Sequence, residues 1–398
     1  SGTGIISTLF ANFPYGNTTA PMKALSAVFF FLNLAVFVLF TSISALRYLL
    51  FRDVWPSMLR HPESLFLGAF PMGGVTLVNT AISLVHGAYG FGGASFVYVV
   101  WAFWWLDVAV SALCCWGLVH VMATRQEHTL KSMSVSWLFP VATLVVSSSA
   151  GGLLAQALQP FSPAHALLTA AFAVFLLSIG LTLSLTVLAV YFYRLVVLGH
   201  PQGGAIVAAF VPLGPAGQAG FSVLLIGESF RALLPVAGSA GLFLGDAAVG
   251  RTVYAVCVCA GFVLWSLATM WLAYALLGFY HVLRRTRVAF GLPFWGMIFP
   301  NGVYANLTIA LGRAFDGARF FRVWGAVYAC FTLALWACVF ARTLVALRAG
   351  TLFDAPASVS ARGQGRGQGR SRAEAGSGSG SGAGTLVEKA EERGAGGA

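Results

Sequence analysis

The sequence has 398 residues, of which 58% are hydrophobic and only 9% are charged, and its formal net charge is +11. Soluble domains carry roughly 25% charged residues, so this composition excludes a water-soluble globular protein. Apolar runs such as residues 24–51 and 164–193 exceed the ~20 residues with which a helix crosses the hydrocarbon core of a bilayer. The chain is therefore predicted to be an all-α, polytopic membrane protein.

Ten apolar segments are predicted from the lengths of these runs and from the polar breaks between them. They cover residues 1–15, 23–51, 64–86, 96–122, 133–157, 163–196, 203–229, 250–283, 292–312 and 320–348. The first segment is short and the chain begins at Ser1 without a methionine, so we expect the chain to start inside the first span. Residues 1–348 are predicted to form one ten-helix transmembrane domain.

The last fifty residues, 349–398, are rich in Gly, Ser and Arg and include the stretches ARGQGRGQGRSR and GSGSGSGAG. Such a segment buries too little apolar surface to offset the entropy of ordering, so it is predicted to be a disordered tail. Its arginines could contact anionic lipids, or the tail could simply be solvated. Nine Lys and Arg residues lie in the loops after segments 2, 4, 6 and 8, against six in the opposite loops. The positive-inside rule then places both termini in the cytoplasm.

Proline falls inside four odd-numbered segments, at Pro71, Pro140, Pro212 and Pro300, with Pro215 close behind Pro212. Proline removes a helical hydrogen bond and kinks the helix. In a bilayer, the carbonyl groups that this frees need cover from protein or from a wet cavity. The alternation predicts five helical hairpins in a ring, with kinked odd helices around a central pore and straight even helices facing lipid. Prolines are common in membrane helices, but that alone does not explain why they fall in odd segments only.

Three of these prolines follow a phenylalanine: Phe70, Phe139 and Phe299. The kinks could aim these rings at the axis, where they would narrow the pore, or the rings could pack the core of the bundle. Small polar side chains on the odd segments are candidates to hold an anion weakly enough to release it. They are Thr76, Asn79, Ser147, Ser148, Ser149, Gln218, Asn301 and Asn306.

Charge favours anions as the cargo, because residues 1–348 carry seventeen Lys and Arg but only seven Asp and Glu. Arginines that snorkel to lipid headgroups account for part of this excess. Asp107 is the clearest ionisable residue inside a span. A carboxylate at that depth costs several kcal/mol unless it is paired or hydrated, so Asp107 must face protein. It could relay protons, or it could tie its helix to neighbours through hydrogen bonds.

A membrane-embedded enzyme is the remote alternative, and the sequence shows few residues that could form its active site. The seven histidines lie at segment ends or in loops without an HExxH pair, and the six cysteines show no metal-binding spacing. No metal, cofactor or nucleic-acid partner is therefore predicted. The expected partners are the lipid bilayer and a small anion.

Five stretches, GTGIISTLFANFPYG, HPESLFLGAFPMG, FVPLGPAGQAGF, LPFWGMIFPNGVY and RFFRVWGAVY, resemble the tellurite-resistance/dicarboxylate transporter superfamily. This superfamily includes the plant slow anion channels, and the resemblance is greatest to its fungal sulfite efflux pump branch. It implies ten helices with quasi-fivefold symmetry around a central pore, and a phenylalanine on the ninth helix that plugs it. The plug would be Phe299, with Phe294 as the alternative.

The same resemblance implies a plasma-membrane protein that exports sulfite or bisulfite and assembles as a homotrimer. Relatives of similar fold carry malate and other C4 dicarboxylates, so a dicarboxylate transporter is the alternative function.

Overall fold

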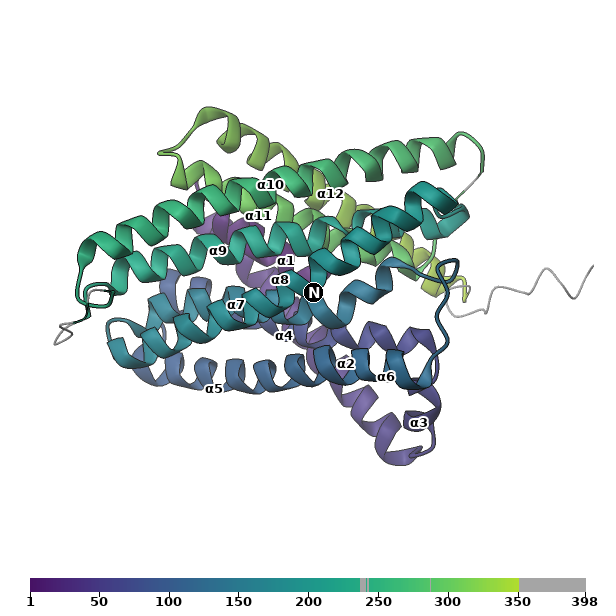
Figure 1. Cartoon of the computed structure of the whole chain (residues 1–398), viewed down its shortest axis with the longest axis horizontal. Coiled ribbons are helices and arrows are strands. Elements are labelled where there is room, and N and C mark those ends of the chain that lie inside the picture. The colour runs from purple at the N-terminus through teal and green to yellow at the C-terminus, as the bar shows by residue number, and fades with distance from the viewer. Residues whose placement is uncertain (237–240, 242, 287, 351–398) are drawn as a thin grey trace, which may run out of the picture. The chain divides into compact units, whose positions relative to one another are not determined.

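The regular structure of the described residues is entirely helical. A computed structural model describes residues 1–236, 241, 243–286 and 288–350, and Ser1–Val345 form the unit whose arrangement is given below. The predicted tail, apart from residues 349 and 350, lies outside the described residues. Figure 1 shows the long helices running in roughly the same direction, along the horizontal axis of the view.

The helices of the first half of the chain are α1 (Gly2–Asn12), α2 (Ala20–Leu50), α3 (Val54–Leu59), η1 (Pro62–Gly68), α4 (Ala69–Thr80), η2 (Ala81–Ala88), α5 (Gly93–Ala112), η3 (Leu113–Leu118), α6 (Val119–Arg125), η4 (Val135–Trp137) and α7 (Leu138–Leu158). Those of the second half are α8 (Pro163–Leu198), η5 (Gly203–Phe210), α9 (Leu213–Leu233), α10 (Ala247–Leu283), η6 (Leu292–Met297), α11 (Ile298–Ala314) and α12 (Arg319–Arg348). They overlap all ten predicted segments. Two of them, η2 and η3, are π-helical turns that continue α4 and α5.

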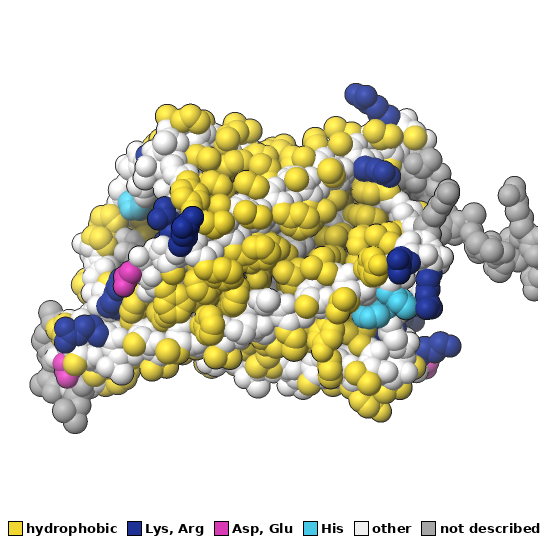
Figure 2. Space-filling view, turned by 90° about the horizontal axis from the view of Figure 1, so that it is seen from above, with side chains coloured by type: hydrophobic (Ala, Val, Ile, Leu, Met, Phe, Trp, Pro, Cys, Tyr) yellow, Lys and Arg dark blue, Asp and Glu magenta, His cyan; other side chains and the backbone are white. Residues whose placement is uncertain are grey.

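Eight helical stretches of the described residues are long and apolar enough to cross a membrane. The set does not include α1, which has 11 residues, or η6 with α11. On the face seen in Figure 2, hydrophobic side chains cover the middle and most charged side chains gather toward the two ends. The protein is therefore an all-helical membrane protein with eight candidate spans.

The candidate spans fall into a buried set and an exposed set. The most apolar windows of Pro62–Ala88, Val135–Leu158 and Gly203–Leu233 are 67%, 89% and 83% buried. The same measure is 17% to 33% for the exposed set, which comprises Ala20–Leu50, Gly93–Arg125, Pro163–Leu198, Ala247–Leu283 and Arg319–Arg348. Thirteen of the 17 residues of α11 are also buried. This pattern agrees with the predicted division into inner odd helices and lipid-facing even helices.

The inner helices, α1, α4, α7, α9 and α11, contact one another in this order, and α11 also contacts α1, which closes the ring. The outer helices pack over the seams: α5 contacts α4 and α7, α8 contacts α7 and α9, and α10 contacts α9 and α11. Hydrogen bonds place α12 across the last seam. Tyr328 Oη donates to Asn301 Oδ1 of α11 over 2.6 Å, and Trp336 Nε1 donates to Thr3 Oγ1 of α1 over 3.3 Å.

Each seam of the inner ring has a glycine where two helices approach closely, namely Gly4, Gly68, Gly152, Gly217 and Gly302. A Cβ atom on Gly68 would lie 2.5 Å from the carbonyl oxygen of Phe139, and one on Gly217 would lie 3.2 Å from the backbone nitrogen of Tyr304. Small residues let membrane helices pack closely, as van der Waals packing requires in lipid. These glycines therefore explain how the five inner helices can form a tight ring.

The prolines of the inner helices mark a change of helix type. Pro71, Pro140, Pro215 and Pro300 are each the third residue of an α-helix that follows a 3₁₀ segment: η1, η4, η5 or η6. A proline in the first turn of an α-helix loses no hydrogen bond, because that N–H has no helical acceptor. The expected kink therefore takes the form of a 3₁₀-to-α junction. In α9 the structural counterpart of the other three prolines is Pro215, whereas Pro212 is the N-cap residue of the helix.

Candidate functional site

The small polar side chains predicted for the odd segments are all buried. They come from α4, α7, α9 and α11, four of the five inner helices. Several bond to one another across the seams. Gln218 Nε2 donates to Ser149 Oγ over 2.7 Å, and the hydroxyls of Ser148 and Ser222 lie 2.5 Å apart. These residues therefore hold α7 against α9, as well as giving the ring a polar interior.

Two of these buried amides have an unpaired atom. Asn79 Oδ1 and Asn306 Nδ2 have no hydrogen-bond partner, and Asn306 is only 1% exposed. Leaving a buried polar group unpaired costs about 1–3 kcal/mol. An oxygen cannot bind an anion, but an amide N–H can. Asn306 is therefore the stronger candidate for an anion ligand.

The structure separates the three phenylalanines that precede prolines. Phe139 and Phe299 are partly buried, and each packs against both of the two largest clusters of buried hydrophobic residues. Phe70 is 44% exposed, and its ring stacks on Phe37 of α2 with centroids 5.2 Å apart. Phe294 packs against one of the two clusters, and the centroid of its ring lies 5.1 Å from that of Phe290. Phe139 and Phe299 thus share a position between the clusters, and Phe70 and Phe294 do not.

The predicted kink prolines, Pro71, Pro140, Pro212, Pro215 and Pro300, are all buried. Gly214 occupies the position before Pro215, where the other three junctions have phenylalanine. A Cβ atom on Gly214 would lie 3.8 Å from Pro300 Cγ, which is ordinary contact. The inner helix α9 therefore contributes no aromatic ring at this position.

Asp107 reaches from the outer helix α5 toward the inner helices. Its Oδ2 accepts a hydrogen bond from Ser147 of α7 over 2.7 Å and one from Ser111 over 3.4 Å. Its Oδ1 lies close to α4, since a Cβ atom on Gly74 would be 2.9 Å from it. These contacts tie α5 to α7 beside α4. A role in proton relay stays a prediction.

A polar pocket of about 200 Å³, the distal pocket, lies where the inner helices end. Its polar lining consists of Asn12, Asn17, Lys23, Ser83 and Arg313, from α1, the loop after it, α2, η2 and α11. Sequence reasoning missed this pocket, because it treated Lys23 and Arg313 only as loop charges. The polar run NFPYGN at the end of the first segment was the available signal.

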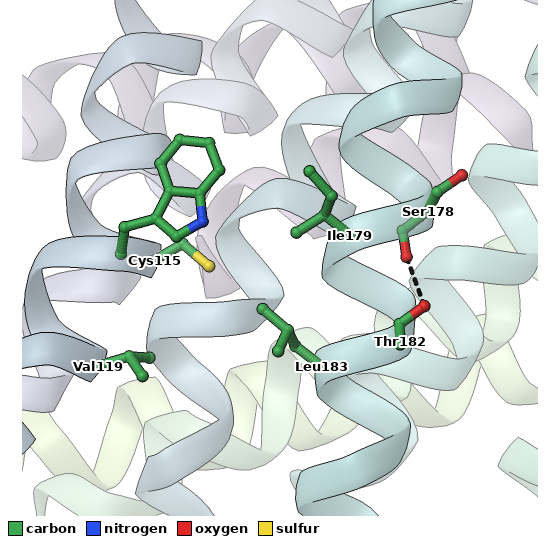
Figure 3. Close-up of a pocket in the computed structure, with 7 residues that line it drawn as sticks. Cys115, Val119, Ser178, Ile179, Thr182 and Leu183 are labelled. Atoms are coloured by element: carbon green, nitrogen blue, oxygen red, sulfur yellow. Dashed lines mark hydrogen bonds between the residues drawn. The ribbon is translucent and has the colours of Figure 1, made fainter. Parts of the chain in front are cut away.

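A larger groove, of about 530 Å³, lies between outer helices (Figure 3). Cys115 and Val119 line one side of it and Ile179 and Leu183 of α8 line the other. Near it, Thr182 Oγ1 donates to the carbonyl oxygen of Ser178 over 2.8 Å, so the hydroxyl is satisfied within α8. The groove is apolar and belongs to the exposed set of helices. It therefore faces lipid and offers an anion no ligands.

A protein-family comparison decides what class of transporter this is. The family model for the voltage-dependent anion channel, SLAC1, matches residues 1–344. The chain belongs to the SLAC1 family. The family membership that the sequence resemblance implied is thus confirmed. Because this is a family of anion transporters and channels, the protein is a multi-pass membrane anion transporter and not an enzyme.

The relatives of this SLAC1-family chain include proteins named as sulfite efflux pumps and one named as a malic acid transport protein. The sulfite efflux pump SSU1 of Trichophyton rubrum is 31% identical over 344 residues, which cover 86% of this chain and 87% of the relative. The protein of the same name from Arthroderma otae is 32% identical over the same length. The malic acid transport protein of Schizosaccharomyces pombe is 22% identical over 330 residues, covering 80% of this chain and 70% of the relative.

Proposed function

We propose that this protein exports sulfite or bisulfite across the plasma membrane, along a path enclosed by the five inner helices. The observation that carries the proposal is the closed ring of inner helices, which contact one another in cyclic order and bury polar side chains. Neutral polar side chains can line a solute path through a membrane protein, as well as joining its helices by hydrogen bonds. The proposed architecture has ten helices, in which α1 and η6–α11 complete the inner ring.

The partial exposure of Phe299, where it packs between two buried clusters, supports it as the gate of the path. Phe139 occupies a similar position and is proposed as a second obstruction. Phe294 remains the alternative gate, since it lies on the 3₁₀ segment that leads into α11.

The choice of sulfite rests on the relatives named as sulfite efflux pumps, which align with this chain over most of both lengths. Malate or another C4 dicarboxylate is the second candidate, supported by the more distant malic acid transport protein. The excess of Lys and Arg at the ends of the spans would attract either anion. A homotrimer with both termini in the cytoplasm completes the proposal.

Flux measurements on the purified full chain in proteoliposomes test the function. Liposomes loaded with sulfite are expected to lose it faster than protein-free liposomes, and malate-loaded liposomes are expected to leak at the protein-free rate. Malate flux without sulfite flux would replace the proposed cargo with a dicarboxylate. If neither anion moved, the proposed cargo class would be wrong.

A further inference from the structure

The distal pocket has the size and the charge of an anion-binding site. We propose that it binds a small oxyanion such as sulfite at the end of the pathway; the choice of this ligand rests on the proposed function. Its volume of about 200 Å³ equals the space of about six or seven water molecules in the liquid. A small oxyanion with part of its water shell fits such a volume, and a drug-sized ligand does not.

Both charged residues that line the pocket are cations. Lys23 Nζ donates one hydrogen bond, to the carbonyl oxygen of Ala88 over 3.3 Å, and Arg313 donates to the carbonyl oxygen and Oδ1 of Asn12 over 2.7 and 3.4 Å. These bonds cap the C-terminal ends of η2 and α1, where cations are favourable. Capping alone does not use all their donors, since an ammonium group has three N–H donors and a guanidinium group has five. The remaining donors are free for an anion.

A chain of hydrogen bonds leads from the pocket into the inner ring. Arg313 donates to Asn12 Oδ1, so the amide nitrogen of Asn12 is left to donate to another group. That nitrogen donates to Asn306 Oδ1 over 3.1 Å. The amide of Asn306 is fixed in turn, with its nitrogen as the unpaired donor. The chain of hydrogen bonds that begins at Arg313 thus leaves a buried N–H of Asn306 free to pair with an anion.

Glu228 of α9 is an acidic group close to this region. Its carboxylate is attracted by Arg231 and, less strongly, by Arg313, and Gln156 Nε2 lies 3.5 Å from its Oε2. Glu228 does not line the pocket. A negative charge on Glu228 would oppose the binding of an anion nearby, so its removal should strengthen anion binding.

Binding can be measured without transport, as the rise in the thermal unfolding midpoint of the purified full chain with sulfite concentration. Ionic strength is held constant with potassium gluconate, because salt screens exposed charges. Lys23→Gln and Arg313→Lys are expected to raise the half-saturating sulfite concentration at least fivefold, and Glu228→Gln is expected to lower it. Arg251→Gln removes an exposed cation of α10 outside the pocket and should titrate like the parent protein.

The site would be refuted if Lys23→Gln, Arg313→Lys and Glu228→Gln all titrated like the parent protein. Glu228→Gln removes no donor from the pocket, so its shift tests the site even if a cation variant does not fold. A parent protein that binds sulfite at this site but moves none in proteoliposomes would refute the proposed function and leave the site standing. If the parent protein moved sulfite but the three variants all titrated like it, the site would be refuted and the proposed function would stand.

Discussion

Asn12 and Asn306 lie 294 positions apart in the chain, and the side-chain nitrogen of Asn12 donates to the side-chain oxygen of Asn306 over 3.1 Å. This bond joins the first inner helix to the last and so closes the ring. It also leaves the nitrogen of Asn306 unpaired in a buried position. This one pair of amides thus joins the inner ring and supplies the unpaired N–H that is proposed to meet the anion.

Replacing Asn306 tests the role of its unpaired nitrogen. Asn306→Asp keeps an acceptor for Asn12 but replaces the free N–H with a negative charge, so sulfite flux should fall about tenfold or more, as expected for a change of at least 1.4 kcal/mol. Asn306→Leu removes the donor without adding charge and should reduce flux less. Proteoliposome flux measures both. Unchanged flux in a well-folded Asn306→Asp protein would show that the anion never meets this amide.

Asp107 is expected to act as a structural tie between α5 and α7. Asp107→Asn keeps an acceptor for Ser147 and should retain both the unfolding midpoint and the pH profile of flux. Asp107→Ala removes the carboxylate acceptor, so that the hydroxyls of Ser111 and Ser147 keep only their bond to each other, and it should cost about 1–3 kcal/mol of stability. The midpoint is measured by thermal unfolding in detergent. An altered pH profile in Asp107→Asn would instead support proton relay.

The close approach of the inner helices predicts a difference between two glycines. A methyl group on Gly68 would lie 2.5 Å from a backbone oxygen of Phe139, whereas one on Gly214 would meet nothing closer than 3.8 Å. Gly68→Ala should therefore lower stability by about 1–3 kcal/mol, the usual cost of overpacking, and Gly214→Ala should leave it nearly unchanged. Equal unfolding midpoints for the two variants would contradict the tight seam between α7 and the start of α4.

His200, in the loop between α8 and η5, gives a pH dependence of stability. Burial, and secondly the nearby His281 and Arg194, lower the pKa of its imidazole below the usual 6.5. In the unfolded chain the pKa returns to its usual value, so the unfolded state binds the proton more tightly. Stability should therefore fall as the pH drops below 6.5 toward the lowered pKa, and it should be free of this penalty at higher pH.

The contribution of His200 is read from unfolding midpoints at pH 5 and pH 8. His200→Gln should reduce the loss between the two pH values, while His61→Gln, which changes an exposed histidine, should not. If both variants lost as much stability as the parent protein, another group would be responsible.

The alternation of prolines predicted the buried odd helices because proline is tolerated in a bilayer only where protein or water covers the freed backbone. The sequence could not show what form the interruption of each inner helix takes at its proline. Proline lowers the cost of a 3₁₀-to-α junction and of a kink alike, so only the structure shows that Pro215, rather than Pro212, is the counterpart of Pro300.

The candidate site was only partly predictable. The burial of Gln218 and Asn306 followed from their place in apolar segments, but their hydrogen-bond partners lie on helices far away in the sequence. Phe70 follows the same Phe-Pro pattern as Phe299, yet it stacks on Phe37 of α2. The distal pocket was missed because Asn12, Lys23 and Arg313 come together only when the ring closes.

The central claim is that an anion path runs between the inner helices and that the ring of Phe299 obstructs it. Sulfite flux from proteoliposomes containing the Phe299→Ala protein tests this claim most directly. The matched control is Phe103→Ala, which removes a ring that is 61% exposed on the outer helix α5. The account predicts a several-fold rise in flux for Phe299→Ala and the parent rate for Phe103→Ala. A folded Phe299→Ala protein with the parent rate of flux would contradict it.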